Sequence, residues 1–186
     1  MDTLVVNAPT SVTAALRRLY LLRFAFAAVW AGLLFTTADT LGPISVTLLV
    51  LYPLFDAACA VVDLRSARAD GGPVRGLYVN LALSALTGVA LAVAAASGIQ
   101  AVLQVWGVWA ITAGITQVAV GVVRRRLGGQ GAMIASGSIS ALAGASFVAQ
   151  ASKDGATLTN IAGYALLGGI FFLVSALRLK PAGEQA

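Results

Sequence analysis

The sequence contains no histidine and a single cysteine, Cys59, among its 186 residues. Without histidine, the protein cannot form a histidine-ligated haem, a histidine-containing zinc site or a Ser-His catalytic pair. One cysteine cannot form an internal disulfide bond or a cysteine pair for a metal. We therefore expect no cofactor and no metal site, and we predict that the protein is not an enzyme.

Charge is also scarce, because charged residues make up 10% of the chain and hydrophobic residues 59%. A soluble domain of this length could not bury that much apolar surface. A membrane-spanning helix needs about 20 apolar residues, twice the length of a barrel strand. Six such runs cover about 19–38, 43–63, 76–96, 99–122, 131–150 and 158–177. The sequence therefore predicts an all-α membrane protein with six transmembrane helices in one integral membrane domain, residues 1–186.

Basic residues are almost absent from one side of the predicted membrane. Of the 12 Lys and Arg residues, only Lys153 falls on that side. By the positive-inside rule, both termini are predicted to be cytoplasmic. The arginine clusters would then face anionic lipid headgroups in the bilayer rather than nucleic acid; a specific polyanion partner is the alternative. Trp106, toward the other end of the fourth span, is expected at the membrane interface. The oligomeric state stays open, a homo-oligomer included.

The chain has a repeat with a step of 56 residues. Three glycines and three basic residues keep this step: Gly32, Gly88 and Gly144, and Arg68, Arg124 and Lys180. A period of this kind indicates a repeat architecture. We predict three helical hairpins, at about 12–68, 69–124 and 125–180. The first run could be a cleaved secretory signal, but similar runs recur in mid-chain, so we expect it to be retained.

The odd-numbered spans carry small residues at every fourth position, for example Ser136, Ser140 and Gly144. This spacing places them on one helix face and lets two backbones approach closely. We therefore predict that the odd spans form the tightly packed inside of the bundle. A polar pathway along Asn80, Ser84, Ser136 and Ser140 is the alternative use of these stripes.

These patterns resemble the HdeD-like membrane proteins, a bacterial inner-membrane family built from a short repeat. The resemblance covers about residues 15–180 and implies a six-span, multi-pass protein of the bacterial plasma membrane. It also implies a non-enzymatic component of stress response or acid resistance, with no catalytic residues. The second span departs from the family pattern at Pro53, Asp56 and Asp63. The resemblance rests on three motifs: Trp109-x4-Gly114-x2-Gln117, Ser138-x-Ser140-x3-Gly144 and Tyr164-x3-Gly168.

Asp56 lies inside the second span, nine residues before Arg65. That spacing places it about 13 Å from the basic edge of a hydrocarbon core about 30 Å thick. An ionisable group there is costly and suggests a function. A carboxyl group away from water favours its protonated form unless a cation pairs with it. We therefore consider Asp56 a candidate proton or ion site of a channel or transporter. The alternative is a structural hydrogen bond or ion pair.

Other polar residues in the spans also need partners. Asp63 follows Asp56 by two helical turns and lies near the cytoplasmic edge, within reach of Arg23 or Arg68. We predict an ion pair between Arg23 and Asp63; Asp56 is the less favoured partner of Arg23. Asn80 and Gln117 are neutral, but they are expensive to leave without hydrogen bonds in hydrocarbon. We predict that they form a polar lining, or hydrogen bonds between helices.

Overall fold

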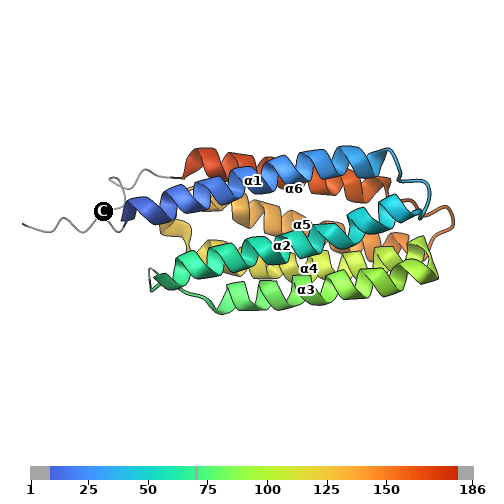
Figure 1. Ribbon diagram of the computed structural model, residues 1–186, viewed down its shortest axis with the longest axis horizontal. Helices are drawn as coiled ribbons and strands as arrows, with labels where there is room; N and C mark the ends of the chain where they lie inside the picture. Colours follow the sequence, from blue (N-terminus) through green and yellow to red (C-terminus); the bar gives the residue numbers. More distant parts are fainter. Residues whose placement is uncertain (1–8, 70, 180–186) are drawn as a thin grey trace, which may run out of the picture.

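Six long helices make up most of the described chain, residues 9–69 and 71–179, in the computed structural model (Figure 1). All six are long and apolar enough to cross a membrane, which confirms the predicted all-α, six-span fold. The 56-residue repeat and the cytoplasmic orientation of the termini stay predictions. The helices are α1 (Pro9–Phe35), α2 (Pro43–Ala69), α3 (Arg75–Ala94), α4 (Ile99–Val123), α5 (Gln130–Gln150) and α6 (Thr159–Arg178). Short 3₁₀ turns, Ala95–Ser97 and Arg125–Leu127, follow α3 and α4.

The first two helices extend beyond the apolar runs that predicted them. α1 begins at Pro9 rather than near residue 19, and α2 continues to Ala69 rather than ending near residue 63. A helix satisfies its own backbone hydrogen bonds, so it can leave the hydrocarbon without ending there. Arginine side chains on these extensions can place their charged ends in the polar headgroup region.

The six helices form a closed ring. Each helix contacts the next one along the chain, and α6 returns to contact α1. The helix axes run side by side along the length of the bundle (Figure 1). The most extensive contacts join α2 with α3, α4 with α5, and α6 with α1. Each helix therefore turns one face to the inside of the ring and leaves another face for lipid.

Glycines bring α4 and α5 into backbone contact. A Cβ atom at Gly114 would lie 2.5 Å from the carbonyl oxygen of Gly137, and one at Gly144 would lie 2.5 Å from that of Gly107. Small residues thus allow close approach, as predicted. The prediction that the odd helices form the inside is wrong, because α3 is the least buried of the six and α2 the most buried. In a ring, odd and even helices have equivalent positions.

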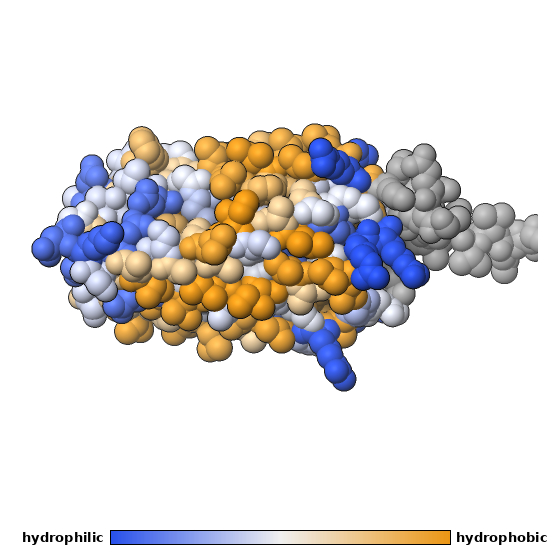
Figure 2. Space-filling model, turned by 180° about the vertical axis from the view of Figure 1, so that it is seen from behind, coloured by the Kyte–Doolittle hydropathy of each residue, from blue (hydrophilic) through white to orange (hydrophobic). Residues whose placement is uncertain are grey.

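The two ends of the bundle are named here by their loops. The basic end carries the α2–α3 and α4–α5 connections with their arginines, and the Lys153 end carries the other three connections. Figure 2 shows an apolar surface over the middle of the bundle, with hydrophilic residues toward both ends. Large apolar side chains project from this surface, among them Leu86 (69% exposed) and Leu142 (74% exposed). This belt is the surface that contacts lipid.

The inside of the ring toward the Lys153 end is filled by large apolar side chains. Trp106 is fully buried there and stacks on Trp30 with 5.6 Å between ring centroids. The prediction that Trp106 lies at the membrane interface is therefore wrong, because its ring faces into the bundle instead. Four rings form an aromatic cluster in this region: Trp30, Tyr52, Trp106 and Trp109. Aliphatic residues complete the core: Leu34, Leu49, Leu91, Leu103, Leu158 and Ile161.

Candidate functional site

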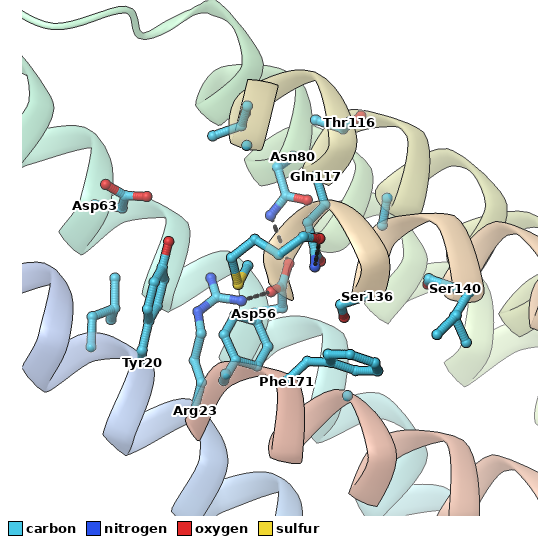
Figure 3. A pocket seen from close by; sticks show the side chains of 18 of the residues that line it. Tyr20, Arg23, Asp56, Asp63, Asn80, Thr116, Gln117, Ser136, Ser140 and Phe171 are labelled. Atoms are coloured by element: carbon cyan, nitrogen blue, oxygen red, sulfur yellow. Dashed lines mark hydrogen bonds and ion pairs between the residues drawn. The ribbon is translucent and has the colours of Figure 1, made fainter. Parts of the chain in front are cut away.

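Asp56, in the middle part of α2, forms an ion pair with Arg23 of α1. Arg23 Nη1 donates to Asp56 Oδ1, and each side chain is 14% exposed (Figure 3). Two charges removed from water are tolerated only when their remaining polar atoms also find partners. The second carboxylate oxygen of Asp56, Oδ2, therefore needs hydrogen-bond partners as well.

Two side chains of α3 hold that second carboxylate oxygen. Asn80 Nδ2 and Ser84 Oγ each donate to Asp56 Oδ2 at 2.7 Å. Ser84 Oγ in turn accepts a hydrogen bond from Trp109 Nε1 of α4, at 3.2 Å. Asn80 and Ser84 are one turn apart on the same face, which lets both reach one oxygen. The carboxylate of Asp56 thus joins α1, α2, α3 and α4 in one network.

A second ion pair lies nearer the basic end. Arg124 Nη1, just after α4, donates to Asp63 Oδ2 at 2.8 Å. The predicted pair between Arg23 and Asp63 is therefore wrong. Both acids lie on one face of α2, two turns apart, but Arg23 is level with Asp56. Asp63 is left within reach of the side chain at the end of α4.

A cavity of about 120 Å³ lies inside the ring and is lined by residues of all six helices. A water molecule needs about 10–15 Å³ of such space and two to four polar partners. Arg23 and Asp56 line this central cavity, together with the second ion pair and several uncharged polar side chains (Figure 3). These polar residues are Tyr20, Asn80, Thr116, Gln117, Gln130, Ser136, Ser140 and Tyr164. The central cavity thus has room for several water molecules or a small solute.

The two predicted lining residues, Asn80 and Gln117, both face the central cavity. Both also make the interhelical hydrogen bonds that the sequence predicted. Asn80 of α3 binds Asp56 of α2, and Gln117 Nε2 of α4 donates to the carbonyl oxygen of Met133 in α5 at 3.0 Å. The lining and hydrogen-bonding interpretations therefore hold together for these two residues.

Sequence reasoning missed the aromatic hydrogen-bond donors of the site. Ser140 Oγ donates to the carbonyl oxygen of Ala110 at 3.0 Å, so its contact with Tyr164 uses the phenol as donor. Trp109 bonds Ser84 in the same manner. Trp109, Ser140 and Tyr164 all occur in the motifs that carry the family resemblance, which was the available signal.

A second cavity, of about 320 Å³, lies at the basic end. Its lining includes Pro73, from the α2–α3 connection, and Arg126, beyond the end of α4. Leu19, Asp63 and Arg124 line both cavities. The Asp63–Arg124 ion pair therefore stands at the boundary between the two cavities.

Within residues 9–69 and 71–179, no group of three or more His, Cys, Asp or Glu side chains could hold a metal ion. Comparison with protein-family models, with curated proteins and with solved structures found no match to this chain.

Proposed function

We propose that this multi-pass membrane protein conducts or transports protons or small ions, with Asp56 as the intramembrane site. The observation that carries this proposal is the Arg23–Asp56 ion pair inside a polar cavity enclosed by six apolar helices. Buried ion pairs can be replaced by apolar side chains without loss of stability, so stability alone does not explain their presence. Ionisable residues that face the inside of a membrane bundle typically mark ion or proton pathways.

The central cavity adjoins a second cavity at one end and a packed core at the other. This difference supports entry of solutes from the basic end. The larger cavity at the basic end adjoins the central cavity across the Asp63–Arg124 pair. Toward the Lys153 end, the stacked rings of Trp30 and Trp106 and the surrounding core pack the inside of the ring. Passage across the membrane requires this core to open in a second conformation. Opening one side while closing the other is the mechanism of alternating access.

The resemblance to HdeD-like proteins supplies a second candidate function, a non-enzymatic component of acid or other stress response in the bacterial plasma membrane. The feature that favours it is again the Arg23–Asp56 pair, because protonation of the carboxylate would break the pair. In this case the protein would respond to acid through a change in helix packing, without net transport. The two candidates differ in whether protons cross the membrane.

Proton flux into liposomes that carry the purified protein distinguishes the candidates. A pH gradient is imposed, and a trapped pH-sensitive dye reports the flux for the native protein and for Asp56→Asn. Asp154→Asn, a change in the loop before α6, is the matched control. Flux in the native protein and the control, but not in Asp56→Asn, supports the transport function. If the native protein gives no more flux than empty liposomes, transport is rejected and the stress-response candidate is favoured.

The orientation is proposed from the arginine distribution alone. With Cys59→Ala as background, a single cysteine replaces Asp154 or Arg125, on opposite ends of the bundle. A membrane-impermeant thiol reagent applied outside intact cells is expected to label the Asp154→Cys protein and to leave Arg125→Cys unlabelled. The reverse pattern would place the basic end, and the larger cavity, on the outer side.

A further inference from the structure

We propose that the central cavity binds a small monovalent anion on Arg23 when Asp56 takes up a proton, so that proton and anion occupy the site together. This inference rests on the proposed function, because it names the species that accompanies the proton at the same site. Two observations carry it: the two oxygens of Asp56 have separate partners, and Nε of Arg23 is buried without one.

The two oxygens of Asp56 have separate partners. Oδ1 accepts from Arg23, while Oδ2 accepts from Asn80 and Ser84. A proton that reaches the cavity can therefore bind Oδ1 and form an O–H bond there. This step removes the charge attraction to Arg23 and leaves both hydrogen bonds to Oδ2 in place. Asp56 stays in position, and only Arg23 is released.

Released from Asp56, Arg23 would be a buried cation without a counter-ion. The guanidinium group stays protonated throughout the accessible pH range. Its Nε is already buried without a hydrogen-bond partner, and the ring of Phe172 lies 5.0 Å from its Cζ. An uncompensated buried charge is strongly unfavourable. Arg23 therefore needs a new acceptor as soon as Asp56 is protonated.

Among residues 9–69 and 71–179, no other acid of the site is available to Arg23. Asp63, the other acid that lines the central cavity, is bound to Arg124. The cavity residues contributed by α3 and α5 are uncharged. The titratable or charged side chains around Asp56 are Tyr20 and Arg23 on α1, Tyr52, Cys59 and Asp63 on α2, Arg124 beyond α4, and Tyr164 on α6. The replacement anion must therefore come from solution.

The cavities suit a small anion. The central cavity of about 120 Å³ has space for chloride or a one-carbon carboxylate. The larger cavity beside it carries Arg124 and Arg126, and among its described lining residues the one acid, Asp63, is already paired. A basic approach of this kind concentrates anions and repels cations. Uptake of one proton with one anion leaves the net charge of the buried site unchanged.

This coupling has a thermodynamic signature. If one proton binds with each anion, the dissociation constant of the anion falls about tenfold for each pH unit of acidification while Asp56 is otherwise ionised. In Asp56→Asn the carboxylate is absent, so Arg23 is free at every pH. That variant is expected to bind the anion independently of pH, and at least as tightly as the native protein at the lowest pH. Arg23→Gln is expected to lose anion binding.

Chloride titrations of the detergent-solubilised protein test the proposal. Gluconate is the only other anion, and isothermal calorimetry and tryptophan fluorescence follow binding at several pH values. The native protein, Asp56→Asn, Arg23→Gln and the Asp154→Asn control are compared. The expected result is the pH-dependent binding described above, without effect of Asp154→Asn. Chloride affinity that is independent of pH in the native protein overturns the proposal, even if a variant does not fold.

Liposome flux in chloride and in gluconate separates this inference from the proposed function. Proton flux that is equal in the two media keeps the transport function and overturns the anion coupling. Flux in chloride that is lost in gluconate supports both. If chloride binding depends on pH but no proton flux occurs in either medium, the coupled site is kept and transport is rejected.

Discussion

The two halves of the ring differ sharply in what fills them. Toward the Lys153 end, the interior is packed with stacked aromatic rings and fully buried aliphatic side chains. Toward the basic end, it holds two ion pairs and two cavities. The same six helices build both halves. The difference must therefore come from which side chains each helix turns inward.

That change takes place within two helical turns. Trp30 follows Arg23 by seven residues on α1, and Tyr52 precedes Asp56 by four residues on α2. These spacings place each pair on one helix face. The face that presents a charge at one level thus presents an aromatic ring at the next. A polar, charged region and a packed aromatic region are thus neighbours on one continuous inner surface.

The largest effect is expected from replacing Asp56, at the centre of the half toward the basic end, here called the polar half. Asp56→Leu leaves Arg23 as an unpaired buried cation and is expected to cost about 3–5 kcal/mol in stability. The double variant Arg23→Met/Asp56→Leu removes both charges and should recover most of that loss. Reversible unfolding in mixed detergent micelles, followed by circular dichroism, measures the difference. Equal destabilisation of the single and the double variant would contradict the ion-pair account.

The α4–α5 contact runs through both halves of the ring. Glycine substitutions along it should therefore lower stability by similar amounts in the two halves. Gly107 lies opposite Gly144, and Gly114 lies opposite Gly137 nearer the basic end. Gly107→Ala and Gly114→Ala each force two backbones apart, and each should cost about 1–3 kcal/mol. Gly163→Ala on α6, where an added Cβ meets no atom within 4 Å, is the control. A neutral Gly114→Ala beside a costly Gly107→Ala would show that the helices are separable in the polar half.

The half of the ring toward the Lys153 end contains two tryptophans that differ in one hydrogen bond. Trp30 Nε1 donates to the carbonyl oxygen of Leu48 at 2.7 Å, whereas Trp106 Nε1 is buried without a partner. Trp30→Phe therefore loses a hydrogen bond, at a cost of about 1 kcal/mol beyond that of Trp106→Phe. Thermal unfolding of both variants gives the comparison. A larger loss for Trp106→Phe would indicate a partner for its indole that the structure lacks.

Sequence reasoning reached the six helices because a spanning helix needs a long apolar run, a local property of the chain. It also selected Asp56, Asn80 and Gln117, since polar groups in such runs are rare. The predicted partner of Asp63, Arg23, was wrong, because pairing with Arg124 depends on how α1 and α4 are staggered against α2. Local spacing does not encode that stagger. The burial of Trp106 was missed for a similar reason, since depth along a helix does not reveal which face turns inward.

The smallest change in stability is expected at the boundary between the two cavities. Asp63→Asn removes the ion pair with Arg124, whose side chains are 15% and 9% exposed beside the larger cavity. Because water in that larger cavity can solvate the released arginine, the loss should fall below the 3–5 kcal/mol expected when the remaining charge stays desolvated, to about 1 kcal/mol. Access to the central cavity should nevertheless rise. A cysteine at Ser136, in the Cys59→Ala background, reports this as its rate of reaction with a small thiol reagent. We expect about fivefold faster reaction in Asp63→Asn than in the Asp154→Asn control, since an ion-pair bridge worth about 1 kcal/mol corresponds to that factor. An unchanged rate would mean that the pair ties α2 to α4 without controlling access, and that the polar half is closed elsewhere.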